Sequence, residues 1–142
     1  NNAWFYTNSW VYGGQHLLYS GSGAFIYGAA YPDNRGNVGI AGWYSGGAYY
    51  PSFFVGKDDD TDGSPPGWGV TYPATSNDGP NGNIWGDYAR VRPFYPMGTC
   101  WLASGHVLRN GGNQGDVHPY YVVFGQGRDS NSCYQNWKQQ GP

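Results

Sequence analysis

The chain contains no glutamate, and its seven basic residues include only two lysines. Methionine occurs once, and leucine and alanine are infrequent. These are the residues that most favour helices, so their scarcity argues against a helical protein. No segment keeps the 3.6-residue apolar spacing of an amphipathic helix over three turns. We therefore expect essentially no helix.

Other absences exclude whole classes of function. The arginines and lysines are scattered and the formal net charge is −2, so the basic patch typical of nucleic-acid binding is missing. No apolar run approaches the roughly 18 residues that cross a bilayer. No signal-peptide pattern is recognisable and the sequence begins with Asn instead of Met, so we expect a mature or processed product. We expect neither a nucleic-acid partner nor a membrane span.

Glycine, proline and aromatic residues are abundant instead. The chain has 25 Gly, 10 Pro, 14 Tyr and 7 Trp, and aromatic residues make up 19% of it. Aromatic and β-branched residues favour strands, while Gly, Pro, Asn and Asp form the turns between them, so an all-β fold follows. Alternating runs between turn signals predict strands over residues 3–12, 16–21, 24–32, 37–45, 49–57, 68–73, 87–94, 99–108 and 119–127.

Two halves of the sequence resemble each other. Residues 26–56 and 84–125 both open with Ile, an aromatic residue and Gly, and both close on a paired-tyrosine strand that ends in Gly. A repeat of this size suits one antiparallel four-stranded sheet with its loops, as in a propeller blade. The alternative is chance similarity between strands rich in Gly and Tyr.

The repeats predict one all-β module over residues 1–142. Its approximate repeats span 1–57 and 68–127, and a C-terminal tail spans 128–142. A propeller needs at least about four blades to close, and this length provides two to three. Three outcomes follow: other chains, including further copies, complete the array; the chain is part of a larger protein; or its sheets stack as a β-sandwich.

The second half carries a family resemblance. It resembles the terminal blades of secreted bacterial β-propellers of the sialidase-like, Asp-box-related type, and the similarity covers roughly residues 24–128. The matching positions are Trp85, Gly86, Asp87 and Tyr88, then Arg92 and Pro93, then Pro119, Tyr121, Val122, Phe124 and Gly125. The resemblance implies a blade-like fold and a secreted protein.

The chain also departs from this family. Gln126 interrupts the usual Gly-Arg finish, and the Asp-box turn survives only as Gly82, Ile84 and Trp85. A sialidase-like site also needs an Arg cluster and a Tyr–Glu pair, and this chain has no Glu. The fold therefore carries over better than an activity does.

An acidic run follows the strand that closes the first half. Asp58, Asp60 and Asp62 alternate before Gly63, a spacing that supplies several hard oxygens to Ca²⁺. The EF-hand signature is incomplete, because Gly69 stands where the Glu ligand is required. Two interpretations stay open: a calcium site on these three residues, or an acidic turn in solvent.

The two cysteines, Cys100 and Cys133, do not fit a zinc pattern, and the three dispersed histidines do not complete one. They form either a disulfide or two buried thiols. Because the composition is typical of extracellular proteins, we expect the disulfide, which would tie the tail to the strand around Cys100.

The remaining candidates concern binding and catalysis. Trp85, Asp87 and Tyr88 form a candidate ligand site, although an Asp at a strand start more often binds neighbouring backbone N–H groups. A glycosidase usually needs two carboxylates at a defined separation, and a pair such as Asp87 and Asp116 would provide them. A Ser-His-Asp triad would need one of the three histidines, His16, His106 or His118, but the sequence contains no GxSxG motif for its serine nucleophile. We therefore assign no catalytic residue.

These observations favour a secreted, non-enzymatic binding or self-assembly module. Tyr and Trp rings beside short polar side chains suit glycans or protein partners. The alternative is a fragment of a sialidase-like, glycan-active propeller enzyme whose catalytic residues lie outside this chain.

Overall fold

The computed structural model describes residues 2–6, 11–58, 68–80, 88–109, 116–129 and 133; for residues 2–16 it describes the backbone alone. These residues form an all-β protein, as predicted. Its nine strands are β1 (Asn2–Tyr6), β2 (Val11–His16), β3 (Ala24–Pro32), β4 (Val38–Gly46), β5 (Tyr49–Asp58), β6 (Trp68–Ala74), β7 (Arg90–Pro93), β8 (Cys100–Leu108) and β9 (Val117–Gly125). A 3-10 turn, η3 (Gly127–Asp129), follows β9.

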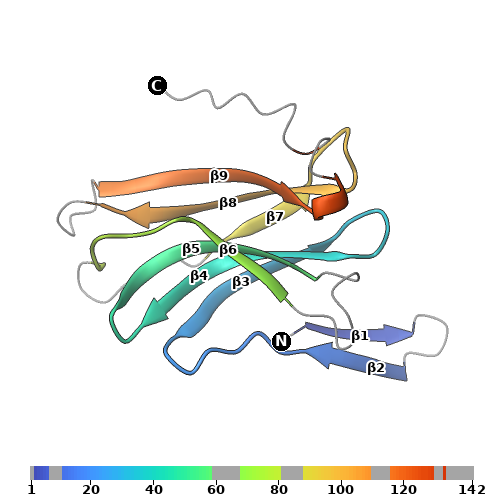
Figure 1. The fold of residues 1–142 in the computed structure, drawn as a ribbon, viewed down its shortest axis with the longest axis horizontal. Coiled ribbons are helices and arrows are strands. Elements are labelled where there is room, and N and C mark those ends of the chain that lie inside the picture. The colour runs from blue at the N-terminus through green and yellow to red at the C-terminus, as the bar shows by residue number, and fades with distance from the viewer. Residues whose placement is uncertain are drawn as a thin grey trace.

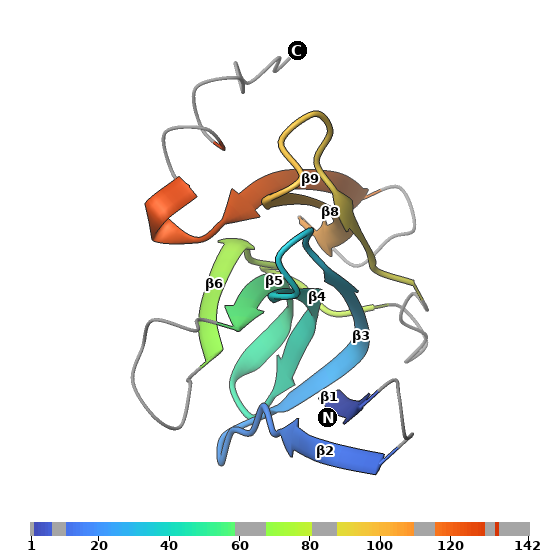
Figure 2. The ribbon, with the colours of Figure 1, turned by 90° about the vertical axis from the view of Figure 1, so that its right-hand side faces the viewer.

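The strands form three antiparallel sheets, none of which is closed. They are the hairpin β1-β2, a four-stranded sheet in the order β3-β4-β5-β6 and a three-stranded sheet in the order β7-β8-β9. Figures 1 and 2 show the four-stranded sheet in the middle, with the three-stranded sheet on one side and the hairpin on the other. No helix in the described part of the chain is long and apolar enough to cross a membrane.

The strand predictions are correct for most of the chain and wrong near its N-terminus. Residues 3–12 were expected to form one strand, but they contribute to two paired strands, in which Tyr6 is opposite Val11. Residues 17–23 lie outside any strand, so the strand expected over 16–21 is also wrong. Leu18 accounts for that error, because it packs from a loop against the four-stranded sheet.

The core lies between the two larger sheets, and its centre is aromatic. Trp43 and Phe53 of the four-stranded sheet and Trp101 and Phe124 of the three-stranded sheet belong to one buried cluster. Each tryptophan also donates a hydrogen bond to the other sheet. Trp43 Nε1 donates to the carbonyl of His106 at 2.7 Å, and Trp101 Nε1 donates to the carbonyl of Tyr31 at 2.9 Å. The buried indoles are thus paired with polar partners and fix the two layers relative to each other.

Two glycines allow the sheets to approach this closely. A Cβ on Gly39 of β4 would lie 2.5 Å from the Trp101 ring, and a Cβ on Gly105 of β8 would lie 2.4 Å from the Phe53 ring. In each sheet, therefore, an aromatic ring from the opposite sheet packs directly against the backbone of a glycine. The strand pattern alone did not show that these glycines are packing positions.

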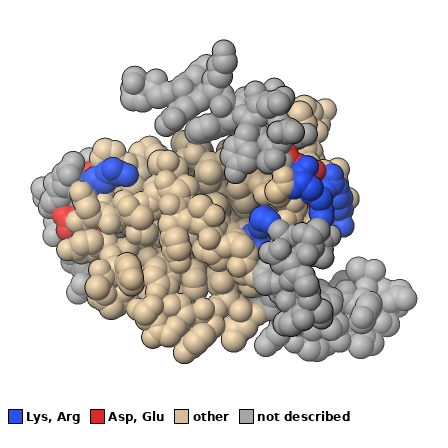
Figure 3. Space-filling model, in the orientation of Figure 1, with Lys and Arg blue, Asp and Glu red and all other residues tan. Residues whose placement is uncertain are grey.

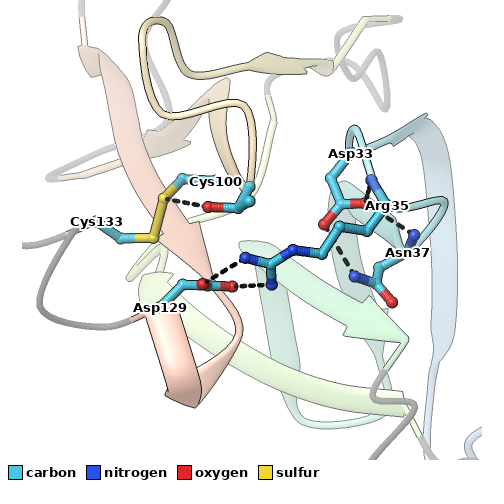
Figure 4. The surroundings of a disulfide bond; sticks show 7 residues. Asp33, Arg35, Asn37, Cys100, Asp129 and Cys133 are labelled. Atoms are coloured by element: carbon cyan, nitrogen blue, oxygen red, sulfur yellow. Dashed lines mark hydrogen bonds and ion pairs between the residues drawn. A yellow bond between two sulfur atoms is a disulfide. The ribbon is translucent and has the colours of Figure 1, made fainter.

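The segment after β9 is tied to the four-stranded sheet. Gln126 is buried; its Oε1 accepts a hydrogen bond from Lys57 Nζ at 2.7 Å, and its Nε2 donates to the carbonyl of Asp58 at 2.7 Å. Arg35 forms a bidentate ion pair with Asp129 at 2.9 and 3.0 Å (Figure 4). These contacts hold η3 beside the β3–β4 turn and the end of β5.

The predicted disulfide is confirmed. Cys100 and Cys133 are bonded, both are fully buried, and their Cα atoms are 5.9 Å apart (Figure 4). A Cβ at Gly125, the register partner of Cys100, would lie 2.5 Å from Cys133 Sγ. Position 125 therefore has no room for a side chain while the bond is formed. The disulfide secures the chain after η3 to the end of the three-stranded sheet.

Candidate functional site

The outer face of the four-stranded sheet, which points away from the three-stranded sheet, carries a cluster of tyrosines. Tyr44 of β4 lies at its centre, and its ring centroid is 5.7 Å from those of Tyr49 and Tyr72. Tyr44 is buried, whereas Tyr49 is 58% and Tyr72 42% exposed. Aromatic rings half-open to solvent offer apolar area together with a polar edge. We call Tyr44, Tyr49 and Tyr72, with Ser20 and Ser22, the tyrosine face.

Two serines bring further hydroxyls to this face. The Tyr44 hydroxyl lies 3.0 Å from Ser20 Oγ and 2.9 Å from Ser22 Oγ, and the two serine oxygens are 3.2 Å apart. These hydrogen bonds lower the pKa of Tyr44, although its burial opposes them. Burial raises the pKa of Tyr72, and the neighbouring Tyr44 and Tyr49 add to the effect. Three hydroxyls thus meet at one point beside two exposed rings.

Local glycines build this arrangement. A Cβ on Gly23 would lie 2.6 Å from the Tyr44 ring, so the loop with Ser20 and Ser22 reaches Tyr44 only because position 23 has no side chain. Gly46 and Gly47 have φ values of 118° and 59°, in the region that favours glycine. They form the tight β4–β5 turn, which returns the chain so that Tyr49 lies beside Tyr44.

A hollow of about 290 Å³ lies on the same outer face. Its walls include Leu18, Phe25, Phe54 and Trp68, and Phe25 contacts both Tyr44 and Phe54 with ring centroids 5.0 Å apart. The hollow is therefore continuous with the aromatic packing beneath the tyrosine face. β4 and β5 are buried on both faces for this reason: one face packs on the core and the other beneath this aromatic cluster.

The ligand site predicted from the sequence is described only in part. Tyr88 is 88% exposed just before β7, and Trp85 and Asp87 lie outside the described residues. Of the Asp87–Asp116 pair, only Asp116 lies within the described residues. The carbonyl of Asp116 accepts a hydrogen bond from the backbone N–H of Arg109 at 3.1 Å. Both hypotheses stay predictions.

Of the three residues predicted to bind calcium, only Asp58 lies in the described part of the chain. Asp58 ends β5 and is opposite Trp68 in the register, while Asp60 and Asp62 lie outside the described residues. Within the described ranges, no group of three or more His, Cys, Asp or Glu side chains is placed to hold a metal ion. Calcium binding at the acidic run stays a prediction that depends on the two residues not described.

His106 has a structural environment. Its ring centroid lies 4.8 Å from that of Trp43, and its carbonyl accepts the Trp43 indole hydrogen bond. Burial lowers the pKa of His106 below its ordinary value of 6.5. These contacts place His106 at the margin of the core, so it serves packing between the sheets. His118, by contrast, is exposed on β9.

Sequence reasoning missed the tyrosine face because four separate segments assemble it. Ser20 and Ser22 precede β3, while Tyr44 lies on β4, Tyr49 on β5 and Tyr72 on β6. The available signals were the Gly46-Gly47 pair before Tyr49 and the Ser-Gly-Ser-Gly run at residues 20–23. No family model matches the sequence, and no curated protein or solved structure matches it either.

Proposed function

We propose that this chain is a secreted, non-enzymatic binding module whose tyrosine face binds neutral glycans. The observation that carries the proposal is the convergence of three hydroxyls, from Tyr44, Ser20 and Ser22, beside the exposed rings of Tyr49 and Tyr72. Tyrosine rings can stack on the apolar face of a sugar ring. Hydroxyls donate and accept hydrogen bonds, as sugar hydroxyls require.

The charge of the face supports a neutral ligand. Its five residues are three tyrosines and two serines, with no acidic or basic side chain among them. A charged ligand would leave its charge unpaired at such a surface, which is unfavourable once water is displaced. The adjoining hollow, lined by Phe25 and Trp68 among others, provides room for a further sugar ring.

The fold supports a blade-like interpretation of the layers. The two meanders β3-β4-β5 and β7-β8-β9 have the same strand order, and they pack face to face through one aromatic core. We propose that they correspond to successive blades of an array; a simple β-sandwich is the alternative. The disulfide between Cys100 and Cys133 is compatible with a secreted protein.

Binding to an array of neutral oligosaccharides tests the proposal. We expect the Tyr49→Ala/Tyr72→Ala double variant to lose at least about tenfold in affinity, which corresponds to about 1.4 kcal/mol. Tyr72→Phe separates the ring from its hydroxyl, because it keeps the stacking surface. Tyr95→Ala is the matched control, since Tyr95 is 89% exposed in the turn between β7 and β8, away from the tyrosine face.

The same glycans separate a binding module from an enzyme fragment. We expect bound glycans to be recovered intact, with no release of reducing ends over long incubation. Hydrolysis would favour the glycan-active enzyme. Equal binding by the wild type and the Tyr49→Ala/Tyr72→Ala variant would refute the assignment to the tyrosine face.

A further inference from the structure

The segment that follows β6 is attached to both β5 and β8. Ser76 Oγ accepts a hydrogen bond from the N–H of Leu108 at 3.0 Å and donates one to the carbonyl of Pro51. The N–H of Asn77 donates to the carbonyl of Leu108 at 3.1 Å. Figure 1 shows this segment at the left-hand end of the molecule, where β8 ends and β9 begins. The chain is therefore held in place immediately before Asp78.

Asp78 and Gly79 follow directly and lie outside any strand. The N–H of Gly79 donates a hydrogen bond to Oδ1 of the neighbouring Asp78 at 2.7 Å. Because Oδ1 is bonded to Cγ, the fold holds the Gly79 nitrogen beside the carboxyl carbon of Asp78. Gly79 has no side chain that would keep these two groups apart. The pair is thus arranged for a reaction between adjacent groups of the same chain.

A main-chain nitrogen beside a carboxyl carbon can close a five-membered ring. The Gly79 nitrogen forms a bond to Cγ of Asp78, and the carboxyl hydroxyl leaves with the amide proton as water. The product is a cyclic imide, which a water molecule then opens. Cleavage of the new bond to Cγ restores aspartate. Cleavage of the original peptide bond leaves isoaspartate, in which the main chain runs through Cγ, and the two steps together neither gain nor lose atoms or electrons.

The second step needs water, and the Asp78-Gly79 pair is partly open to solvent. Both residues are half-buried. Figure 3 shows charged side chains of both signs at the surface of the left-hand end of the molecule, where the segment after β6 lies in Figure 1. Water can therefore reach a cyclic imide formed at this position.

The other described aspartates lack this arrangement. Among the described residues, only Asp78 is an aspartate followed by glycine. The buried carboxylate of Asp33 accepts hydrogen bonds from the N–H groups of Arg35 and Asn37, not from the residue next to it. Asp129 forms the bidentate ion pair with Arg35. The geometry therefore distinguishes Asp78 from these carboxylates.

We infer that Asp78 is a site of spontaneous covalent modification, at which the folded chain converts aspartate to isoaspartate through a cyclic imide with Gly79. The conversion lengthens the main chain between Asn77 and Gly79 by a methylene group and moves the carboxylate onto Cα. We expect it to weaken the adjacent Asn77–Leu108 hydrogen bond, which attaches the end of β6 to β8. This inference does not depend on glycan binding.

Peptide mapping of the full chain, with its disulfide intact, tests the inference. The protein is incubated for weeks at mildly acidic pH and, in parallel, at mildly alkaline pH, and isoaspartate is then located by electron-transfer fragmentation. The conversion leaves the mass unchanged, whereas deamidation of the adjacent Asn77 would raise it. We expect isoaspartate at position 78, formed faster at acidic pH because the carboxyl group must be protonated to leave as water.

Two glycine variants test the geometry. Gly79→Ala is compatible with the fold, because its Cβ would meet only the Tyr50 ring, at 3.8 Å, and the φ of Gly79 lies outside the region that favours glycine. Its methyl group hinders the approach of the nitrogen to Cγ, so we expect isoaspartate to form at least about fivefold more slowly. Gly28→Ala is the matched control, since a Cβ there meets nothing within 4 Å, and it should convert at the wild-type rate.

The Asp62-Gly63 pair provides a comparison within the same chain, because it has the same two residues. Isoaspartate at position 62 but not at 78 would overturn the inference, and so would equal rates in Gly79→Ala and the wild type. Conversion of Asp78 only in the unfolded chain would also overturn it. Amide hydrogen exchange tests the consequence: we expect the N–H groups of Asn77 and Leu108 to exchange faster in the converted protein. Unchanged exchange would refute the weakened attachment of β6.

Discussion

Gly39→Ala should test the packing of the two sheets most directly. The new Cβ would lie 2.5 Å from Cδ2 of Trp101 and 2.7 Å from its Cγ and Cε2. Non-bonded carbon atoms rest at about 3.5–4.0 Å, so the ring or the strand must move by about 1 Å. Trp101 has little freedom to do so, because it is fully buried and its Nε1 donates to the Tyr31 carbonyl.

The expected loss of stability follows from these contacts. Forcing an additional methyl group into a well-packed core costs about 1–3 kcal/mol. Weakening the Trp101–Tyr31 hydrogen bond adds about 0.5–1.5 kcal/mol. Replacing Gly by Ala offsets about 0.4–1 kcal/mol, because it reduces the freedom of the unfolded chain. We therefore expect the free energy of unfolding to fall by about 2 kcal/mol, within a range of roughly 0.5–4 kcal/mol.

Denaturant unfolding with the disulfide intact, followed by tryptophan fluorescence, measures this loss. Gly28→Ala is the control in the adjacent strand of the same sheet, because its Cβ would meet nothing within 4 Å. We expect the control to unfold at the wild-type midpoint or slightly above it. If Gly39→Ala matched the control to within about 0.5 kcal/mol, the effect ordinarily seen for a neutral surface change, the close contact with Trp101 would be refuted.

Two further predictions concern the disulfide and His106. Replacing Cys100 and Cys133 together by Ala should lower the free energy of unfolding by roughly 3–4 kcal/mol, because the bond closes a loop with a separation of 33 residues; an unchanged denaturation midpoint would contradict this. Burial lowers the pKa of His106 in the folded chain below its ordinary value of 6.5. As the pH falls through 6.5, His106 is therefore protonated more readily in the unfolded chain than in the folded one. We expect the free energy of unfolding to decrease below pH 6.5 for this reason. His106→Gln should flatten that decline in denaturation curves measured at several pH values; a decline as steep as that of the wild type would count against the assignment.

The strands from β3 to β9 were predictable because each lies between strong turn signals. Gly46 and Gly47 end β4, and Asp33 turns the chain after β3 by accepting the backbone N–H groups of Arg35 and Asn37. Such local chemistry is visible in the sequence. The N-terminal region was misjudged because the apolar run Leu17–Tyr19 has the composition of a strand. In the structure that run is a loop, and packing of Leu18 on the outer face of the four-stranded sheet explains its apolar character.

The candidate sites could be predicted much less well, because contacts between distant segments build them. The hydrogen bonds between Tyr44 and the two serines, Ser20 and Ser22, span 24 and 22 positions, and the Lys57–Gln126 bond spans 69. Local motifs directed attention to the acidic run and to the Trp85-Gly86-Asp87-Tyr88 segment instead. Gln126 illustrates the difference. As a departure from a family motif it only weakened a resemblance, whereas in the structure it is a buried residue that binds Lys57 and Asp58 at the end of β5.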